Sequence, residues 1–346
     1  MSTKVISVRN VNDALSVGLE YLLKHGKEAP SRNGTVIVAP GPVVTEYEKP
    51  WERVLFSLVR RANPFFHLME SLWMLAGRND IAFPSYFNKR FVSYSDDGRL
   101  QHGAYGHRWR NWFGFDQLDW IVRELREHPN SRRAVLTMWD GARDPQMVVE
   151  NGVDVPCNTQ AYFEIRDKKL NMTVCCRSND MIWGGYGANA VHFSILQEYI
   201  ATQVGVDIGV YRQISNNYHV YTDVYPRSSL EAMMDESCRV NYYSEQSPIP
   251  MKTFPLITQT HCSTWDAEVI DFVKNPYSDR FAIGDCDTFF TNVAVPMYYA
   301  WDERKKGLSD GMYQAGFITA PDWRLACCQW IQQTDAAKGV LDGTAA

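Results

Sequence analysis

The chain has 346 residues, 45% of them hydrophobic, and a formal net charge of −5. That length and composition can bury a sizeable core, and no apolar run approaches the ~20 residues that a membrane span needs. The mild acidic balance argues against a protein that grips a nucleic-acid backbone, whereas a small anionic ligand needs only a local cluster of arginines.

The cysteines argue against a structural metal site. None of them forms a C-x-x-C pair: Cys157, Cys175, Cys176, Cys238, Cys262, Cys286, Cys327 and Cys328. A zinc framework is therefore not expected, and no metal is predicted. Because the N-terminus does not resemble a signal peptide, we expect reduced thiols and a cytoplasmic protein.

The first predicted elements are a helix and a strand. Residues 11–25 have helical periodicity, with Asn12 or Asp13 as a plausible cap. Residues 26–34 are expected to form a loop, and the apolar, β-branched residues 35–45 a strand.

A second, apolar helix is predicted at 64–77, with a proline in its first turn and a glycine at its end. The later predictions are a helix at about 116–127, strands at 134–139, 159–166 and 170–176, and a helix at 189–204. Residues 240–275 and 305–346 give mixed signals. Since no repeat or linker interrupts the chain, this order predicts one α+β domain over residues 1–346, with a sheet backed by helices.

Cys157 is the first candidate for chemistry. It follows Pro156 at the predicted mouth of a strand, where it could act as a nucleophile. A nucleophilic thiolate needs nearby cations to lower its pKa. On composition alone, a buried structural cysteine is the commoner alternative.

Two further motifs carry arginine. Arg177 and Ser178 lie side by side at a strand end and can bind a phosphate, the arginine bidentately and the serine through its hydroxyl group. A surface ion pair between Arg177 and Asp180 is the alternative. Arg132 and Arg133, between a predicted helix and a strand, are interpreted on their own as solvated charge.

Glu70 stands inside the apolar helix, between Met69 and Leu72. Glutamate is rarely buried without a partner or a function. This carboxyl group could have a raised pKa and carry out general acid–base catalysis. A helix face turned to solvent is the alternative, which the apolar neighbours weaken.

The remaining candidates are aromatic or polar. Trp109 and Trp112 could wall a cleft for a planar ligand, and His219 with Tyr221 could hydrogen-bond a sugar, although each pair alone is more often structural. His192, among apolar neighbours, is interpreted as a satisfied core histidine rather than a ligand.

Taken in chain order, these pieces resemble the thymidylate synthase family, which also contains the pyrimidine nucleotide hydroxymethylases. Beyond about residue 226 the resemblance fades. Each motif is weak alone, but together they occur in family order with fitting spacings: Arg32-Asn33-Gly34-Thr35, Glu70-Ser71-Leu72-Trp73 with Gly77, Tyr105-Gly106 with Trp109 and Trp112, Ser131-Arg132-Arg133, Pro156-Cys157, Arg177-Ser178-Asn179-Asp180, Asn189, and His219 with Tyr221.

The resemblance implies a role for each position. Cys157 would add to C6 of the pyrimidine, and Glu70 would organise water and proton transfer. The other implied roles are phosphate binding by Arg32, Arg177 and Ser178, with Arg132 and Arg133 serving the phosphate of the partner subunit; base and sugar binding by Asn189, His219 and Tyr221; and folate binding by Trp109, Trp112 and Asp180.

The resemblance further implies an obligate homodimer with the sheet at its interface. Its substrate would be a pyrimidine nucleotide monophosphate and its one-carbon donor 5,10-methylenetetrahydrofolate, with no metal, membrane or nucleic acid required. Thiolate addition at C6 would make C5 reactive. Hydride from the folate would then give a methyl group and water a hydroxymethyl group, and exclusion of water would decide between them.

The sequence departs from the family at residues that would contact the base and at the C-terminal tail. Asn158 stands where the family usually has histidine, and a loop one residue longer leaves Ala188 or Asn189 to read the base. An asparagine amide can both donate and accept, which suits uracil, whereas an aspartate would favour cytosine. Asn217 replaces a common aspartate, and residues 335–346 do not resemble the tail that closes the synthase site.

These departures narrowly favour hydroxymethylation of dUMP over methylation to dTMP, with a dCMP hydroxymethylase or methylase as a further alternative. Divergent members of this kind occur in phages that modify their DNA bases, which suggests a phage source. A catalytically silent nucleotide- or RNA-binding relative is the alternative of another class, and intact Cys157, Glu70 and Arg177 count against it. An unrelated thiol hydrolase would need a histidine partner that no motif supplies.

Overall fold

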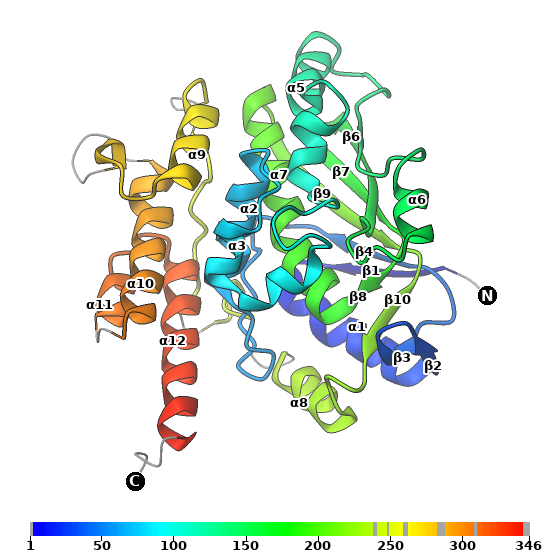
Figure 1. Ribbon diagram of the computed structural model, residues 1–346, viewed down its shortest axis with the longest axis vertical. Coiled ribbons are helices and arrows are strands. Elements are labelled where there is room, and N and C mark those ends of the chain that lie inside the picture. The colour runs from blue at the N-terminus through cyan, green and yellow to red at the C-terminus, as the bar shows by residue number, and fades with distance from the viewer. Residues whose placement is uncertain are drawn as a thin grey trace.

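A six-stranded sheet forms the main layer of the fold (Figure 1). The structure, a computed structural model, describes residues 3–237, 241–247, 249–258, 262–281, 288–307 and 310–341. In spatial order the strands are β1 (Lys4–Val8), β4 (Val43–Tyr47), β9 (Asp207–Ser215), β7 (Lys169–Cys176), β6 (Asn158–Arg166) and β5 (Val135–Thr137). β1 pairs with β4, and β7 with β9, in parallel, and the other neighbours are antiparallel. The sheet is therefore mixed, which confirms the predicted fold class.

A second sheet has four short strands in the order β2 (Lys27–Ser31), β3 (Gly34–Val38), β10 (Tyr218–Tyr221) and β8 (Asn179–Asp180). β10 pairs with β3 on one side and with β8 on the other. This small sheet brings three sequence-distant segments together: the turn that carries Arg32, the chain after Arg177, and the strand that carries His219.

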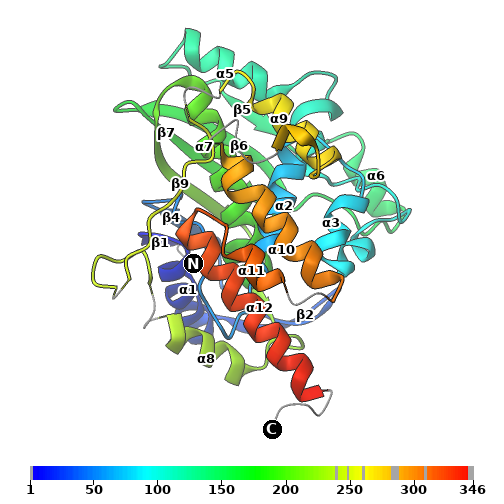
Figure 2. The same cartoon turned by 90° about the vertical axis from the view of Figure 1, so that its left-hand side faces the viewer.

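Helices cover the main sheet and extend the fold away from it. They are α1 (Val11–His25), α2 (Pro64–Leu75), α3 (Ala82–Phe87), α4 (Tyr105–His107), α5 (Gln117–Glu127), α6 (Asp144–Val149), α7 (Asn189–Val204), α8 (Arg227–Ser237), α9 (Trp265–Lys274), α10 (Val295–Lys305), α11 (Gly311–Ala315) and α12 (Pro321–Leu341). Buried α7 packs on β7 and β9, and α2 and α5 pack on α7. The C-terminal helices α9, α10 and α12 pack against α2 and form an outer layer, seen in front of it in Figure 2.

Several sequence expectations hold. The helices at 11–25 and 189–204 begin and end where predicted, and α2 carries the buried face expected for residues 64–77. The turn between β6 and β7 has positive φ angles of 50° at Asp167 and 60° at Lys168, as a tight hairpin requires.

The cap of α1 was predicted wrongly. The side chain of Asn10 accepts hydrogen bonds from the backbone N–H groups of Asn12 and Asp13, so the cap lies just before the two predicted positions. The reason is that the cap residue itself lies outside the periodic apolar pattern.

Two segments near the N-terminus also differ from expectation. Residues 26–34 include the strand β2, because an edge strand tolerates Pro30 where no ladder hydrogen bond is needed. Residues 35–45 form two strands, β3 and β4, that belong to different sheets, with Pro40 and Pro42 in the break. Apolar content alone did not reveal that break.

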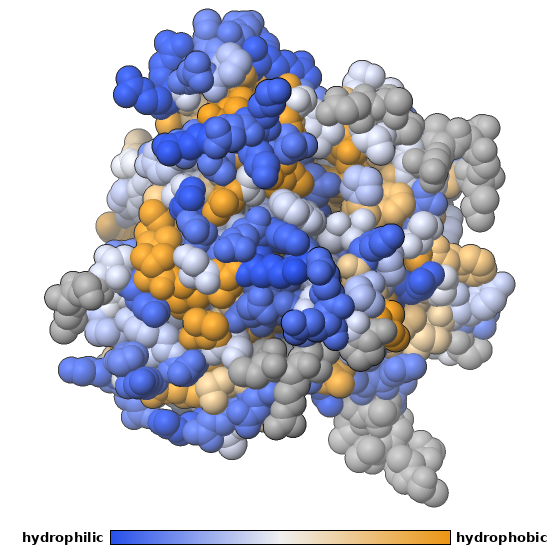
Figure 3. Space-filling view, turned by 180° about the vertical axis from the view of Figure 1, so that it is seen from behind, coloured by the Kyte–Doolittle hydropathy of each residue, from blue (hydrophilic) through white to orange (hydrophobic). Residues whose placement is uncertain are grey.

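Within the described part of the chain, no helix is both long and apolar enough to cross a membrane. In the same residues no group of three or more His, Cys, Asp or Glu side chains could hold a metal ion. On the face seen in Figure 3, apolar residues gather in patches separated by hydrophilic ones.

Candidate active site

Cys157 lies directly before β6, at the strand mouth that the sequence predicts. The hydroxyl group of Tyr105 accepts hydrogen bonds from the backbone N–H groups of Cys157 at 3.1 Å and Asn158 at 3.0 Å. On the other side, the backbone N–H of Arg177 donates to the carbonyl of Cys157 at 2.8 Å. The backbone of Cys157 is therefore held from both directions.

The guanidinium group of Arg177 also holds the segment before Cys157. Its Nε donates to the carbonyl of Pro156 at 2.8 Å, and its Nη2 to that of Val155 at 3.0 Å. Two of its five N–H groups are used in this way, so the same cation can position the thiol and still meet an anion.

Cys157 lines two cavities. The first, of about 500 Å³, is open toward the small sheet and contains the cations and hydroxyl groups predicted to bind a phosphate and a sugar. Its polar lining consists of Ser31, Arg32, Asn33, Cys157, Arg177, Ser178, Asn217, His219 and Tyr221. The structure therefore brings Arg32, Arg177 and Ser178 together with Cys157 in one pocket.

The second cavity, of about 310 Å³, lies on the α2 and α7 side of Cys157. Its aromatic walls are Phe66, Trp73, Phe91, Tyr94, Tyr105 and Trp183. Its polar lining consists of Glu70, Asn88, Arg90, Gln101, Asp154, Asn189 and His192. Aromatic walls with a few convergent polar groups suit a flat heterocycle.

A cavity of similar size, about 510 Å³, lies at the opposite end of β7 and β9. Its lining includes Lys169, Glu198 and Asp207 but none of the predicted site residues. It does not include Cys157, the candidate nucleophile, so we do not assign it to the candidate site.

Burial raises the pKa of the Cys157 thiol. The charges of Arg177 and Arg32 lower that pKa in part, and Asp154 raises it further. The site thus contains the cations that a thiolate needs, but their effect is opposed by low solvent exposure and by one carboxyl group.

Asp154 is a titratable group that the sequence reading missed. Burial raises its pKa to about 7, and the backbone N–H groups of Gly103 and His102 lower it in part. Among the described residues its Oδ2 has no hydrogen-bond partner. A side chain at Gly103 would meet Asp154 Oδ1 at 2.6 Å, so glycine permits this close approach.

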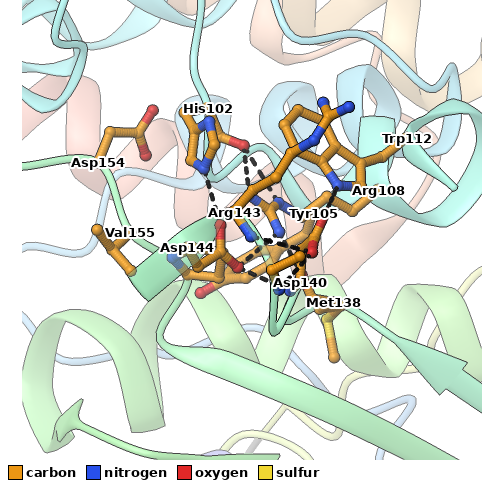
Figure 4. A network of polar contacts seen from close by, with 12 residues as sticks. His102, Tyr105, Arg108, Trp112, Met138, Asp140, Arg143, Asp144, Asp154 and Val155 are labelled. Atoms are coloured by element: carbon orange, nitrogen blue, oxygen red, sulfur yellow. Dashed lines mark hydrogen bonds and ion pairs between the residues drawn. The ribbon is translucent and has the colours of Figure 1, made fainter. Parts of the chain in front are cut away.

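Beside Asp154 lies a buried polar network (Figure 4). Arg108 donates to both oxygens of Asp144, at 2.7 and 2.8 Å, and His102 lies 2.8 Å from the same carboxylate. Trp112 donates to Asp140 at 2.8 Å. The network anchors the segment that carries Tyr105, whose hydroxyl group holds Cys157.

A chain of hydrogen-bonded side-chain amides begins at Asn158, next to Cys157. Asn158 Nδ2 donates to Asn189 Oδ1 at 3.3 Å, and Asn189 Nδ2 donates to Asn179 Oδ1 at 3.3 Å. Asn179 in turn donates to Ser215 at 2.8 Å. Both Ala188 and Asn189 line the second cavity, but only the amide of Asn189 takes part in this chain.

Glu70 and His192 both line the second cavity, and their side chains are in contact. Glu70 Oε2 lies 3.1 Å from His192 Nε2, and the two side chains are 13% and 4% exposed. The distance is that of an ion pair, but the two atoms are not aligned for a hydrogen bond, and among the described residues neither has another partner. The expectation that Glu70 is largely buried is confirmed. His192 is buried, as its interpretation as a core residue requires, but that interpretation is wrong in one respect, because its Nε2 lacks a hydrogen-bond partner among the described residues.

The structure places other predicted residues away from the cavities. Trp109 is buried, and neither it nor Trp112 lines either cavity. Asp180 caps the following turn through the N–H groups of Ile182 and Trp183. Their folate roles stay predictions.

Arg132 and Arg133 are exposed and line neither cavity of their own chain. Arg133 pairs with Glu124 at 2.9 Å. Their predicted binding of the phosphate in the site of a partner subunit stays a prediction.

Sequence reasoning missed several side chains of the second cavity. Trp183 is 40% exposed in its wall, with the guanidinium of Arg60 4.7 Å from its ring, and Tyr94 is 53% exposed. The position of Trp183 in a glycine-rich loop could have identified it as a candidate site residue from the sequence. Asp154 offered a weaker one, as a lone carboxylate between two valines close to the nucleophile.

Comparison with known proteins identifies the family of this chain. Residues 18–274 match the family model described as thymidylate synthase. A deoxyuridylate hydroxymethyltransferase of Pseudomonas phage M6 is 45% identical over 96% of this chain and 95% of its own length. The chain belongs to the thymidylate synthase family.

Other members of the family are more distant. A deoxyuridylate hydroxymethyltransferase of Bacillus phage SP01 is 35% identical over 67% of this chain and 62% of its own. A putative thymidylate synthase of Methanosarcina mazei is 30% identical over 63% of this chain and 89% of its own. Family membership makes the protein a one-carbon transferase that acts at C5 of a pyrimidine nucleotide, and the resemblance seen in the sequence is confirmed.

Proposed function

We propose that the protein transfers a one-carbon unit from methylenetetrahydrofolate to C5 of dUMP and releases 5-hydroxymethyl-dUMP. The observation that carries this proposal is the position of Cys157 between a cationic cavity and an aromatic one. The names of the two phage relatives, with 45% and 35% identity, support the choice of substrate and product.

The cationic cavity suits the nucleotide's phosphate and sugar. Arg32 and Arg177 supply charge for the phosphate, and Ser178 supplies a hydroxyl group. His219 and Tyr221 face the same cavity and can hydrogen-bond the sugar hydroxyl group. Anchoring the remote phosphate places the ring beside the sulfur and lowers the entropic part of the barrier.

Cys157 is the nucleophile in this proposal. Its sulfur bonds to C6 of the ring, and the electron pair of the C5–C6 double bond moves to form an enolate, which makes C5 nucleophilic. In this proposal Asn189 reads the base from the aromatic cavity, whose wall contains its amide beside Asn158. An amide can donate to one edge atom and accept from another, which matches uracil.

The aromatic cavity suits the folate. Its walls offer Trp183, Tyr94 and Phe66 for stacking against a flat ring, and its volume adjoins the sulfur. When bound there, methylenetetrahydrofolate supplies the one-carbon unit. Glu70 lies in the same cavity and can accept or deliver protons near the reacting carbon.

The test is to incubate the protein with methylenetetrahydrofolate and each of dUMP, dCMP, UMP and CMP, and to weigh the product. The proposal expects dUMP to gain CH₂O, with no absorbance change from dihydrofolate. A gain of CH₂ with dihydrofolate would make the protein a thymidylate synthase instead. No product and no release of tritium from C5-labelled dUMP or dCMP would favour a silent nucleotide-binding relative.

The proposal includes a homodimer formed through the main sheet. The side chains that alternate with the buried ones on β4, β7 and β9 are only partly covered within the chain. They include Val44, Val210 and Ile214, whose apolar surface a second copy would bury. Arg132 and Arg133 would then complete the phosphate site of the partner subunit.

A further inference from the structure

The contact between Glu70 and His192 is the feature that the family resemblance does not explain. It joins the middle of α2 to the first turn of α7, in the wall of the cavity that also contains Cys157. The facing atoms, Glu70 Oε2 and His192 Nε2, are buried and lack a hydrogen-bond partner within the described residues. Buried polar atoms in this state commonly hold a water molecule or act on a ligand.

The surroundings of the pair are polar on the cavity side. Gln101, Asp154 and Asn189 line the same cavity as the pair, so the cavity can hold water, whereas Trp183 and Tyr94 form its aromatic walls. His67 lies one turn before Glu70 in α2, and burial, together with the nearby charges of Arg60 and His192, lowers its pKa. His67 lines neither cavity, so it offers a matched reference for a buried histidine next to the site.

The proposed product requires water to attack a specific carbon. Once the one-carbon unit is on C5, the C5 proton leaves and the C–N bond to the tetrahydrofolate amine breaks, so the nucleotide carries an exocyclic methylene group while C6 is still bonded to sulfur. Water forms a C–O bond at the methylene carbon, the electron pair moves into the ring, and the C6–S bond breaks to release the thiolate. One proton leaves the water, and no oxidant or reductant is consumed.

We propose that His192 positions the Glu70 carboxylate as the base that takes this proton, and thereby favours hydration of the methylene group over its capture by other reagents. This inference rests on the proposed function. His192 acts through Glu70 and is a positioning residue. Its Nε2 lies 3.1 Å from one carboxylate oxygen of Glu70, and both residues line the cavity that also contains Cys157.

The experiment compares His192→Leu with wild type in the presence of dUMP, methylenetetrahydrofolate and 2-mercaptoethanol. The added thiol captures the same methylene carbon as a thioether, so the ratio of hydroxymethyl to thioether product measures water capture. Tritium release from C5-labelled dUMP reports the steps before that branch. We expect the ratio to fall about tenfold or more while tritium release changes less than about threefold.

Two further variants separate positioning from packing. His192→Gln has an amide that can donate to the same carboxylate oxygen, and it should return the ratio to near the wild-type value. His67→Leu removes a buried histidine from the same helix as Glu70 and should leave the ratio unchanged. If His192→Leu does not fold, His192→Asn, whose side chain is too short to reach Glu70, takes its place.

Three outcomes would overturn the inference: an unchanged ratio in the leucine variant, an equal fall in the His67 variant, or no recovery with glutamine. Failure of the proposed function is a different result, because the wild-type protein would then form no hydroxymethyl product from dUMP at all.

Discussion

Replacing Asp154 with asparagine should change how the protein's stability depends on pH. The carboxyl group has a pKa of about 7 in the fold against an ordinary value of 3.8, because it is buried with one oxygen unpaired. A raised carboxyl pKa means that the folded state binds the proton more tightly than the unfolded state. Its contribution is fully present below about pH 4 and is lost as the pH rises through about 7.

The magnitude follows from the two pKa values. About three units at about 1.4 kcal/mol each give a total loss on the order of 4 kcal/mol by pH 8. About 2.5 kcal/mol of that loss falls between pH 5 and pH 8. Asparagine has nearly the same shape but does not ionise, so the Asp154→Asn protein should lack this part of the pH dependence.

The assay is urea unfolding of both proteins at pH 5, 6, 7 and 8. The difference in unfolding free energy between variant and wild type should shift in favour of the variant by about 2.5 kcal/mol across that range. Asp167→Asn is the control, because Asp167 is exposed in the β6–β7 turn and asparagine tolerates its positive φ of 50°. Parallel pH profiles for Asp154→Asn and wild type would refute the reasoning.

Three other predictions concern the network, the nucleophile loop and the dimer. Asp144→Asn removes one charge of the fully buried pair with Arg108 and should lower the unfolding free energy by about 3–5 kcal/mol; a loss under 1 kcal/mol in urea titration would contradict this. Arg177→Lys keeps the charge but loses the two bonds to the loop carbonyls, so kcat/KM for dUMP should fall by about tenfold or more, and an unchanged value in steady-state assays would count against the positioning role. Cys157→Ala and Arg133→Ala should each be nearly inactive alone, yet a refolded equal mixture should recover about a quarter of wild-type activity, since half of the dimers have one intact site. Absence of recovery would argue against arginines shared across the interface.

Much of the fold was predictable because its signals are local. The helix α1 follows from apolar periodicity, α7 from a long, mostly apolar run, and the β6–β7 hairpin from two short apolar runs around a charged turn. The outer helices α9 to α12 were not predictable in the same way. The helices α9, α10 and α12 are stabilised by packing against α2, and α11 packs against α10 and α12, so their positions depend on tertiary contacts that the local sequence does not reveal.

Part of the site was predictable for a similar reason. Cys157, Arg177 and Ser178 stand in short motifs at strand ends, so residue type and neighbours were enough to identify them, and the structure gathers them with Arg32 in one cavity. The tail at residues 335–346 lies partly outside the described residues, and its role stays a prediction.

The sequence by itself determined the helices α1, α2, α5 and α7 and the β6–β7 hairpin, and it identified Cys157, Arg32 and Arg177 as candidate site residues, because each of these signals is local in the sequence. Only the tertiary structure decided that His192 meets Glu70 and that Asp154 is buried beside the sulfur with a raised pKa. The physical reason is that burial and contact depend on how α2, α7 and the strand mouth pack together, and no stretch of sequence contains all three.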